Sequence, residues 1–251
     1  MYLLFTVVIS GYSQIGIGTP TPDASSVLEL SSTTQGFLPP RMTYSDMTSI
    51  VSPAEGLVVY CLDCDPKGLC YYDGTDFLNT VSGLVASELL EIGKFMHGGI
   101  VFWIDPTDSS HGLVCAVEDQ SSGNRWYNGS YVETGATATA IGTGLANTDT
   151  IISVQGALET TYAAGLANAY TGGGFSDWFL PSKDELAEMY DKKTEINAGA
   201  SLNSGSDFYL GYYWCSTESG TAAAWSQNFS NGNQISGLKG STYVVRPVRA
   251  F

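Results

Sequence analysis

Apolar and polar positions alternate over short stretches in the first third of the chain. Val58 to Leu62 and Leu69 to Tyr72 show a period of two, and turn residues bound both runs. This pattern is typical of small strands. Residues 15–80 therefore form a small β-rich unit with a thin core, which would gain stability by packing against a neighbour or against copies of itself. Residues 81–92 are expected to be a linker or a short helix between two units.

A second unit begins at residue 93 with two strand-length apolar runs, GGIVFWIDP and HGLVCAVED, which the polar TDSS joins into an expected hairpin. Residues 120–150 then show no apolar period, and a loop of this length is usually functional or disordered. Beyond it, apolar positions from Ile151 to Ala169, Leu158 included, recur every three or four residues. They predict one amphipathic helix, capped by Thr148 or Asp149.

The stretch FSDWFLPSKDELAEMY, residues 175–190, predicts a second helix. Pro181 ends the preceding strand, Ser182 caps the helix, and Glu185 reaches back to the amide of the cap. Leu186, Met189 and Tyr190 form its buried stripe. A polar loop, residues 197–207, separates this helix from three strand-like segments. Within those segments, Asn231-Gly232 predicts a two-residue hairpin turn, and Pro247 is expected where no backbone amide is paired.

The charge balance excludes whole classes of partner. The chain of 251 residues has 25 acidic and 10 basic residues and a formal net charge of −15. We therefore expect no nucleic-acid partner and no phosphate-binding surface. The 29 glycines and 15 tyrosines, with many small polar residues, suit neutral ligands such as sugars, although β-rich proteins in general share this composition.

The sequence contains few residues that could form a catalytic site. The two histidines, His97 and His111, each precede a glycine in an expected turn, so a nucleophile paired with a histidine base is not supported. A hydrolase with paired carboxylates is the remaining enzymatic alternative. We expect no enzyme and no cofactor.

The first residues resemble a secretory signal peptide. Residues 1–14 contain an apolar run from Leu3 to Ile9 followed by small and polar residues. A buried first strand is the alternative. The run is too short to cross a bilayer, which needs about 20 apolar residues, and no later run is long enough. An extracellular or cell-surface location without a membrane span is expected.

Five cysteines are present, and three of them, Cys61, Cys64 and Cys70, lie within ten residues. In an oxidising compartment one local disulfide among the three is expected, and the spacing leaves the pairing open. A structural zinc site needs four ligands, and the sequence offers no fourth ligand beside these three cysteines. Asp177 with Glu185 or Glu218 lacks the alternating acids of a calcium loop, so no metal is expected.

The second unit resembles a known family. The segments GGIVFW, HGLVCAVEDQS, AIGTGLANT, DWFLPSKDEL, YYWCSTES, AAAWSQNFSNG and YVVRPVRAF occur in this order over residues 93–251. They resemble the Lcl C-terminal domain family of bacterial surface proteins, which is similar in fold to C-type lectins. The resemblance implies an α+β domain with adjacent terminal strands, two helices and long loops on one face. It implies adhesion, with glycans as the leading ligand class. Cys215 replaces the usual serine.

The first unit resembles a connector segment of secreted bacterial surface proteins and of phage tail-fibre proteins. The resemblance rests on IGIGTPTPDASSVLELSSTTQGFLPPRMT, SPAEGLVVY and YYDGTDF. Because such segments trimerise in fibres, it implies a stalk and a homotrimer through residues 15–80. A tail-fibre or connector subunit, located in a virion, is therefore the alternative function. A display scaffold with a hypervariable zone over residues 201–240 is a further variant.

The expected ligand contacts lie in the two polar loops. Aromatic rings flanked by amides hold sugars by stacking and by directional hydrogen bonds. The alternative is that the rings fold inward and pin a long loop that is otherwise entropically costly. A glycan or a cell-surface protein is the expected partner. Three other tryptophans, Trp178, Trp214 and Trp225, are expected in the core. The candidate residues are Trp126, Tyr127, Asn128 and Tyr131 in the first loop, and Asn203, Ser206, Asp207 and Tyr209 in the second.

Overall fold

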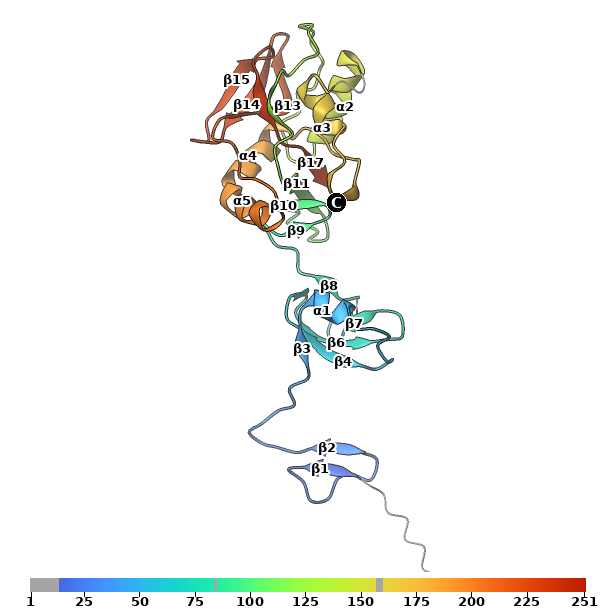
Figure 1. Cartoon of the computed structure of the whole chain (residues 1–251). Coiled ribbons are helices and arrows are strands. Elements are labelled where there is room, and N and C mark those ends of the chain that lie inside the picture. The colour runs from blue at the N-terminus through green and yellow to red at the C-terminus, as the bar shows by residue number, and fades with distance from the viewer. Residues whose placement is uncertain (1–13, 84, 157–159) are drawn as a thin grey trace, which may run out of the picture. The chain divides into compact units, whose positions relative to one another are not determined.

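The computed structural model describes residues 14–83, 85–156 and 160–251. Contacts within the chain divide it between Leu89 and Leu90 into two compact units (Figure 1). None of the helices in these described ranges combines the length and the hydrophobicity needed to cross a bilayer. Residues 1–13 of the expected signal segment lie outside the described residues.

The N-terminal unit is built from short strands. Val59 faces Cys70 in an antiparallel pair, so the two strands predicted at 58–62 and 69–72 are confirmed. The strands are β1 (Ile15–Ile17) and β2 (Leu28–Leu30) in a parallel pair, β3 (Arg41–Met42), β4 (Val58–Cys61), β6 (Gly68–Tyr72) and β7 (Phe77–Asn79) in a four-stranded sheet, and β5 (Cys64–Asp65) paired with β8 (Ser87–Glu88).

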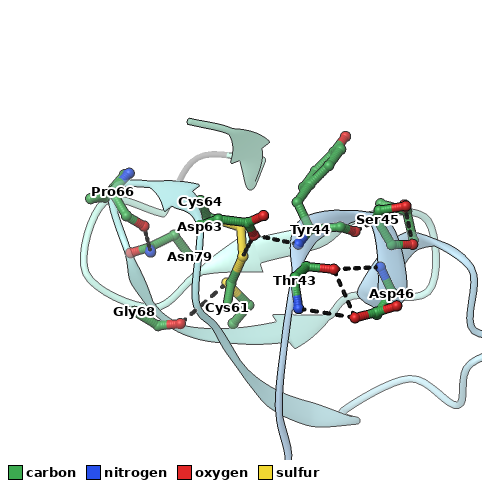
Figure 2. Close-up of a disulfide and its surroundings, with 12 residues drawn as sticks. Thr43, Tyr44, Ser45, Asp46, Cys61, Asp63, Cys64, Pro66, Gly68 and Asn79 are labelled. Carbon is green, nitrogen blue, oxygen red and sulfur yellow. Dashed lines mark hydrogen bonds between the residues drawn. A yellow bond between two sulfur atoms is a disulfide. The ribbon is translucent and has the colours of Figure 1, made fainter. Parts of the chain in front are cut away.

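This unit also contains one short helix, α1 (Tyr44–Thr48), that the hydrophobic pattern did not predict. The Thr43 hydroxyl accepts a hydrogen bond from the Asp46 amide at 3.1 Å, and the Asp46 carboxylate accepts one from the Thr43 amide at 3.4 Å (Figure 2). This is a capping box. The helix buries Met47 in the core of the unit.

A disulfide joins Cys61 and Cys64 at the end of β4 (Figure 2). Cys70 is a free, buried thiol, and burial raises its pKa. Between the two bridged cysteines, the Asp63 carboxylate accepts a hydrogen bond from the Tyr44 amide at 2.6 Å. The bridged turn is therefore tied to the start of α1, and the pairing that the spacing left open is settled by proximity.

No helix forms in the described part of residues 81–92, so that alternative of the prediction is wrong. The backbone of β8 pairs instead with β5, with Cys64 facing Glu88 and Asp65 facing Ser87. Leu84 lies outside the described residues. A short strand forms here because a partner edge is present, which a periodicity argument does not register.

The C-terminal unit contains two sheets. The family resemblance implied adjacent first and last strands, but within the described residues the last strand pairs with the third strand of the unit, where Val114 faces Arg249, and the first strand lies at the opposite edge of the same sheet. One sheet has the order β17 (Val248–Ala250), β11 (Gly112–Cys115), β10 (Gly99–Ile104), β9 (Phe95–Met96), and the other has the order β12 (Ser121–Asn124), β16 (Tyr243–Val245), β13 (Tyr212–Gly220), β14 (Ala223–Asn228), β15 (Gln234–Leu238).

Both predicted hairpins form. Strands β10 and β11 are antiparallel, with Val101 facing Val114. Strands β14 and β15 are also antiparallel, but the turn is longer than the predicted two residues, because Asn228 still donates to the carbonyl of Asn233 at 2.9 Å. Gly232 lies within this turn at φ 80°, a conformation that favours glycine.

Helices occupy the middle of this unit. They are α2 (Gly144–Gln155), α3 (Ala163–Asn168), the single 3₁₀ turn η1 (Gly172–Gly174), α4 (Lys183–Asp191) and α5 (Lys193–Leu202). The helix predicted at Ser182 is confirmed, since its hydroxyl accepts from the Glu185 amide at 3.2 Å and Glu185 accepts from the Ser182 amide at 2.7 Å. The fold is thus mixed, with more strand than helix, and the described residues of this unit form four α-helices in place of the expected two.

The single helix predicted to run to Ala169 is wrong. Helix α2 ends at Gln155 because Gly156 adopts φ 102°, and α3 begins separately after Tyr162. Thr148 does not cap a helix. It is buried within α2, where its hydroxyl accepts from the Leu180 amide at 3.0 Å. Leu158 lies outside the described residues. Similarly, α5 extends through the first half of the polar loop predicted at 197–207.

Strand β13 separates two hydrophobic cores. Tyr213 and Cys215 face the core that includes β10, β11, α4 and α5, whereas Trp214 faces the core that includes α2 and α3. Alternation along a strand buried on both faces produces this division. Trp178 and Trp214 are fully buried, as predicted, while Trp225 is half-buried beneath the Lys183 ammonium at 3.8 Å.

Candidate ligand-binding face

The first polar loop is anchored by a tryptophan that the sequence suggested as a ligand contact. Trp126 is fully buried in the second core, and its Nε1 donates to the Cys215 carbonyl at 2.8 Å. The ring therefore has no face free for a ligand, and the prediction of Trp126 as a binding residue is wrong. The physical reason is the alternative noted above, that aromatic rings turn inward to pin a long loop.

A buried ion pair holds the next part of this loop. Lys239 and Glu218 form a salt bridge with both side chains inaccessible to solvent. The ammonium also donates to the carbonyls of Val132 and Thr221 at 2.8 and 2.9 Å. The carboxylate accepts from the Thr134 amide at 2.9 Å, so the pair fixes the loop backbone on both sides. Charges buried in this way are stable only when they are paired and hydrogen-bonded.

The protonation of Glu218 follows from these contacts. Burial acts to raise the pKa of the carboxyl, but the hydrogen bonds from Lys239 and from the amides of Thr134 and Gly135 outweigh it, and the pKa lies below its ordinary value. A lowered pKa means that ionised Glu218 stabilises the fold at pH values above the unfolded pKa of 4.5, and that this stability is lost as the pH falls through the folded value.

We expect Glu218→Gln to change the pH dependence of thermal stability. At neutral pH the variant melts at a lower temperature, because the Lys239 ammonium is left buried without a counter-charge. Between pH 5 and 3 the difference from the wild type shrinks, since the wild type loses its own carboxylate. Melting curves across this range test the expectation. Glu133→Gln, an exposed acid in the same loop, is the control. A difference that stays constant over the whole range would contradict the expectation.

Tyr131 is the ring that the first loop presents to solvent. It is 49% exposed and stacks on the mostly buried Tyr127, with ring centroids 4.6 Å apart and an interplanar angle of 14°. Asn128 is occupied, since its backbone amide donates to the Gln155 side chain at 3.1 Å and its side-chain amide donates to the Gln155 carbonyl. The stacked pair thus offers one supported aromatic face, and Asn128 ties the loop to the end of α2.

The second loop presents one tyrosine in the same way. Tyr209 is 60% exposed, and its amide donates to the Tyr213 hydroxyl at 2.6 Å. Asn203 donates to the Gly199 carbonyl at 2.8 Å at the end of α5. Asp207 is exposed and accepts from the Ser201 hydroxyl at 3.5 Å. Tyr209 is therefore the residue of this loop that has a large aromatic surface free.

Tyr209 borders a pocket of about 490 Å³. The pocket is lined by Asp119, Gln120, Ser121, Ser122, Tyr209 and Val244. It lies where the end of the 112–120 segment meets β12, β16 and the second loop. No histidine or cysteine is among these lining residues, so the pocket offers a ring, a carboxylate, hydroxyls and an amide.

The floor of this pocket is made rigid by a network around Asp119. Its carboxylate accepts from Arg246 Nε at 2.7 Å and from the Tyr213 hydroxyl at 2.7 Å. Arg246 is fully buried and also donates to the Ser206 carbonyl at 3.1 Å. Burial raises the pKa of Asp119, although Arg246 opposes it, and burial together with Asp119 raises the pKa of Tyr213. The network fixes Tyr209 through Tyr213.

Comparison with family models identifies both parts of the chain. A model described as the Lcl C-terminal domain matches residues 115–249, more than half of the sequence. The chain belongs to the Lcl C-terminal domain family. A model described as a phage tail like trimerisation region matches residues 16–91. Both resemblances noted in the sequence are thereby confirmed.

Two further comparisons were made. Among solved structures, a crystal structure of a fimbrial protein from Bacteroides ovatus matches with a TM-score of 0.43 and 14% identity, and covers 72% of this chain. The chain spans just over half, 56%, of that fimbrial protein. No curated protein matches the sequence.

The Lcl domain contains two buried charged networks that sequence reasoning missed. Lys239 and Glu218 are 21 positions apart in the sequence. Arg246 and Asp119 are 127 positions apart, near opposite ends of the domain. The available signal was a charge within an apolar run, as in YVVRPV, because such a charge needs a partner. Which acid supplies that partner is decided only by the fold.

The cysteines of the Lcl domain are not reactive groups. Cys115 and Cys215 are fully buried, and burial raises the pKa of each to about 12. Both are therefore neutral thiols at physiological pH, and the nucleophilic form is the thiolate. The Cys215 thiol donates to the Trp225 carbonyl at 3.1 Å. Its role is packing in the core.

The acids considered for calcium do not form one cluster. Asp177 pairs with Arg249, Glu185 closes the capping box of α4, and Glu218 pairs with Lys239. In the N-terminal unit, Cys61, Asp63 and Cys64 place ligand atoms within 4.8 Å of one another, but the two sulfurs form the disulfide. Each of these groups is thus engaged in a structural contact.

Proposed function

We propose that this protein is an exported, surface-displayed homotrimer whose Lcl domains bind a glycan. The observation that carries the proposal is the union, in one chain, of a phage tail-like trimerisation region and an Lcl domain with supported, exposed tyrosines. In this proposal the Lcl domain has a C-type-lectin-like arrangement and binds without converting its ligand. The protein acts in adhesion or recognition at the outside of the cell.

The chemistry of the pocket supports a neutral carbohydrate as the ligand. Tyr209 supplies an exposed ring for stacking, and Gln120 and Ser122 place polar side chains beside it. The Asp119 carboxylate is held by Arg246 and Tyr213. The Ser121 hydroxyl at the pocket wall has no hydrogen-bond partner among the described residues. The net charge of −15 disfavours sulfated or other anionic glycans.

Trimerisation strengthens such a site. Single glycan sites on a protein surface bury little area, and the affinity of each is correspondingly low. Linking three sites makes the second and third contacts intramolecular, which raises the overall avidity by about 10² to 10⁴ when the ligands are spaced to suit. A trimer that displays three Lcl domains would therefore hold a glycan-covered surface more tightly than a single domain.

We expect Tyr209→Ala to weaken glycan binding by the full-length protein by about tenfold for each site, corresponding to about 1.4 kcal/mol. The reason is the loss of the stacking surface at the pocket, and Tyr131→Ala tests the other exposed ring in the same way. Binding is measured on an array of neutral and acidic glycans, followed by titration of the best neutral ligand.

The matched control is Tyr71→Ala, which removes an exposed tyrosine from the N-terminal unit and should leave binding unchanged. Sedimentation confirms that each variant keeps the wild-type oligomeric state. An array on which the wild type binds no glycan would reject the glycan proposal. Equal binding by the wild type and both loop variants would reject these tyrosines as the site.

A structural subunit of a phage tail fibre or connector is the second candidate. The match of residues 16–91 to a phage tail like trimerisation region favours it. In that role the trimer is the function, and the Lcl domain serves as a display scaffold whose loops can vary. A stable trimer that incorporates into tail particles and binds no glycan would favour this candidate over the first.

A further inference from the structure

The β1–β2 ribbon has one wholly apolar face. The two strands lie side by side (Figure 1). They are parallel, with Ile15 facing Leu28 and Ile17 facing Leu30. Because side chains two apart in a strand share a face and paired residues lie on the same side, these four side chains form one surface. They are 56, 53, 59 and 45% exposed in the order just given.

The opposite face of the ribbon is covered by its own connection. A Cβ atom at Gly16 would meet the carbonyl oxygen of Thr19 at 2.5 Å and the Pro22 ring at 2.8 Å. Glu29, on the same side as Gly16, accepts from the Asp23 amide at 2.6 Å. The loop between the strands therefore packs on one side, and the apolar side is the one left to solvent.

Such a ribbon is not stable in isolation. Its strands have three residues each, and no third strand joins them in the described chain. A two-stranded ribbon in water is marginal at best, and independent stability needs more strands or a packed hydrophobic face. An exposed, contiguous apolar face of this kind indicates an interaction site.

We propose that this face, formed by Ile15, Ile17, Leu28 and Leu30, is the contact through which three copies of the chain associate. The ribbons of three chains meet with their apolar faces inward, around a threefold axis. The inference rests on the trimeric part of the proposed function and specifies its interface. The match to a trimerisation region covers the ribbon from Gly16 onward, which makes copies of this chain the occupant of the face.

The two most exposed large apolar residues of the unit fit this role less well. Val51 and Val81 are almost fully exposed, but each stands next to a polar residue on the chain and belongs to no described strand. Isolated apolar residues on a surface are ordinary and need no partner. These two residues therefore provide the matched control for the ribbon.

The first test is the oligomeric state of the full chain with the double substitution Ile17→Ser and Leu30→Ser. The wild type is expected to sediment at three chain masses, and the variant at one chain mass over the same concentrations. The trimer is expected to weaken by about 100-fold or more, because two apolar contacts are lost in every copy. The control carries Val51→Ser and Val81→Ser and should remain a trimer.

The outcomes separate this inference from the function proposed above. If the wild type is a monomer, the trimeric proposal and the interface both fail. If the wild type and the ribbon variant are both trimers, the interface alone is wrong. If the control dissociates and the ribbon variant does not, the contact lies in the 40–83 region and the inference is overturned. Glycan binding by a monomeric variant would leave the ligand proposal intact.

A second measurement uses the unmodified protein, so that it does not depend on how a variant folds. The Ser31 amide donates to the Ile17 carbonyl at 2.9 Å and the Ile15 amide to the Val27 carbonyl at 2.8 Å. Hydrogen exchange of residues 14–31 should be slow where the chain is a trimer and fast after dilution to monomer, while residues 90–251 exchange alike in both states. Equal exchange of residues 14–31 in the two states would overturn the inference.

Discussion

Lys239→Met is expected to lower the free energy of unfolding of the C-terminal unit by about 3–5 kcal/mol. The substitution leaves the Glu218 carboxylate buried without its counter-charge and removes the donors to the carbonyls of Val132 and Thr221. Burying an uncompensated charge is among the costliest single changes in a protein. The backbone of the first loop should also become sensitive to protease.

Denaturant unfolding followed by tryptophan fluorescence measures this effect cleanly. All five tryptophans lie beyond residue 90, so the signal reports the C-terminal unit alone. Lys192→Met, a partly exposed lysine in the same unit, should change stability by less than about 0.5 kcal/mol. The pair substitution Lys239→Met with Glu218→Gln should recover part of the loss, because no charge is then left buried. A loss below about 1 kcal/mol for Lys239→Met alone would show that water reaches the pair.

Trp126→Ala is expected to destabilise the same unit by about 3–5 kcal/mol. The ring is fully buried in the core that includes α2 and α3, and its removal leaves a cavity beside the Lys239 ammonium, which lies 4.7 Å from the ring centroid. Trp126→Phe keeps much of the packing but loses the hydrogen bond to the Cys215 carbonyl, so its cost should be smaller.

The same pair of variants decides what Trp126 does for binding. Any loss of ligand affinity in Trp126→Ala should follow its loss of stability and disappear under conditions in which the variant is folded. Tyr131→Ala should show the reverse, with stability changed little and binding changed directly, because that ring is exposed. Unchanged stability in Trp126→Ala would contradict the buried position of the ring.

Elements specified by neighbouring residues were predictable. The capping box of Ser182 and Glu185 and the antiparallel pairing of β10 with β11 are both confirmed. In each case the deciding contacts lie within a few residues or within one hairpin. Helix α1 has the same cap spacing in Thr43 and Asp46. It was not predicted because the threonine is not followed by a long apolar period.

Elements that depend on distant partners were not predictable. Helix α2 begins at Gly144, before any apolar period, because its first turn packs against Glu185 and Phe179 from elsewhere in the chain. Its continuation into α3 is prevented by the conformation of Gly156. Periodicity records which positions are apolar, and it does not record where another segment will stop or start a helix.

The candidate site divides in the same way. The sequence shows that aromatic residues lie in two polar loops. Only the structure shows that Tyr131 and Tyr209 are exposed and that Trp126 is buried. The pocket beside Tyr209 needed Asp119 and Arg246, which are 127 residues apart and whose pairing no local pattern encodes. A charged residue in an apolar strand indicates that a partner of opposite charge is needed, but the local sequence does not identify that partner.

For this protein, the sequence alone determined the two-part organisation, the family of each part, and the local caps and hairpins. The tertiary structure decided which rings face solvent, which acids pair with Lys239 and Arg246, which cysteines are bridged, and which face of the β1–β2 ribbon is left apolar and open. The reason is physical. Caps and turns depend on residues that are near one another in the chain, whereas burial and ion pairing depend on contacts between segments that only folding brings together.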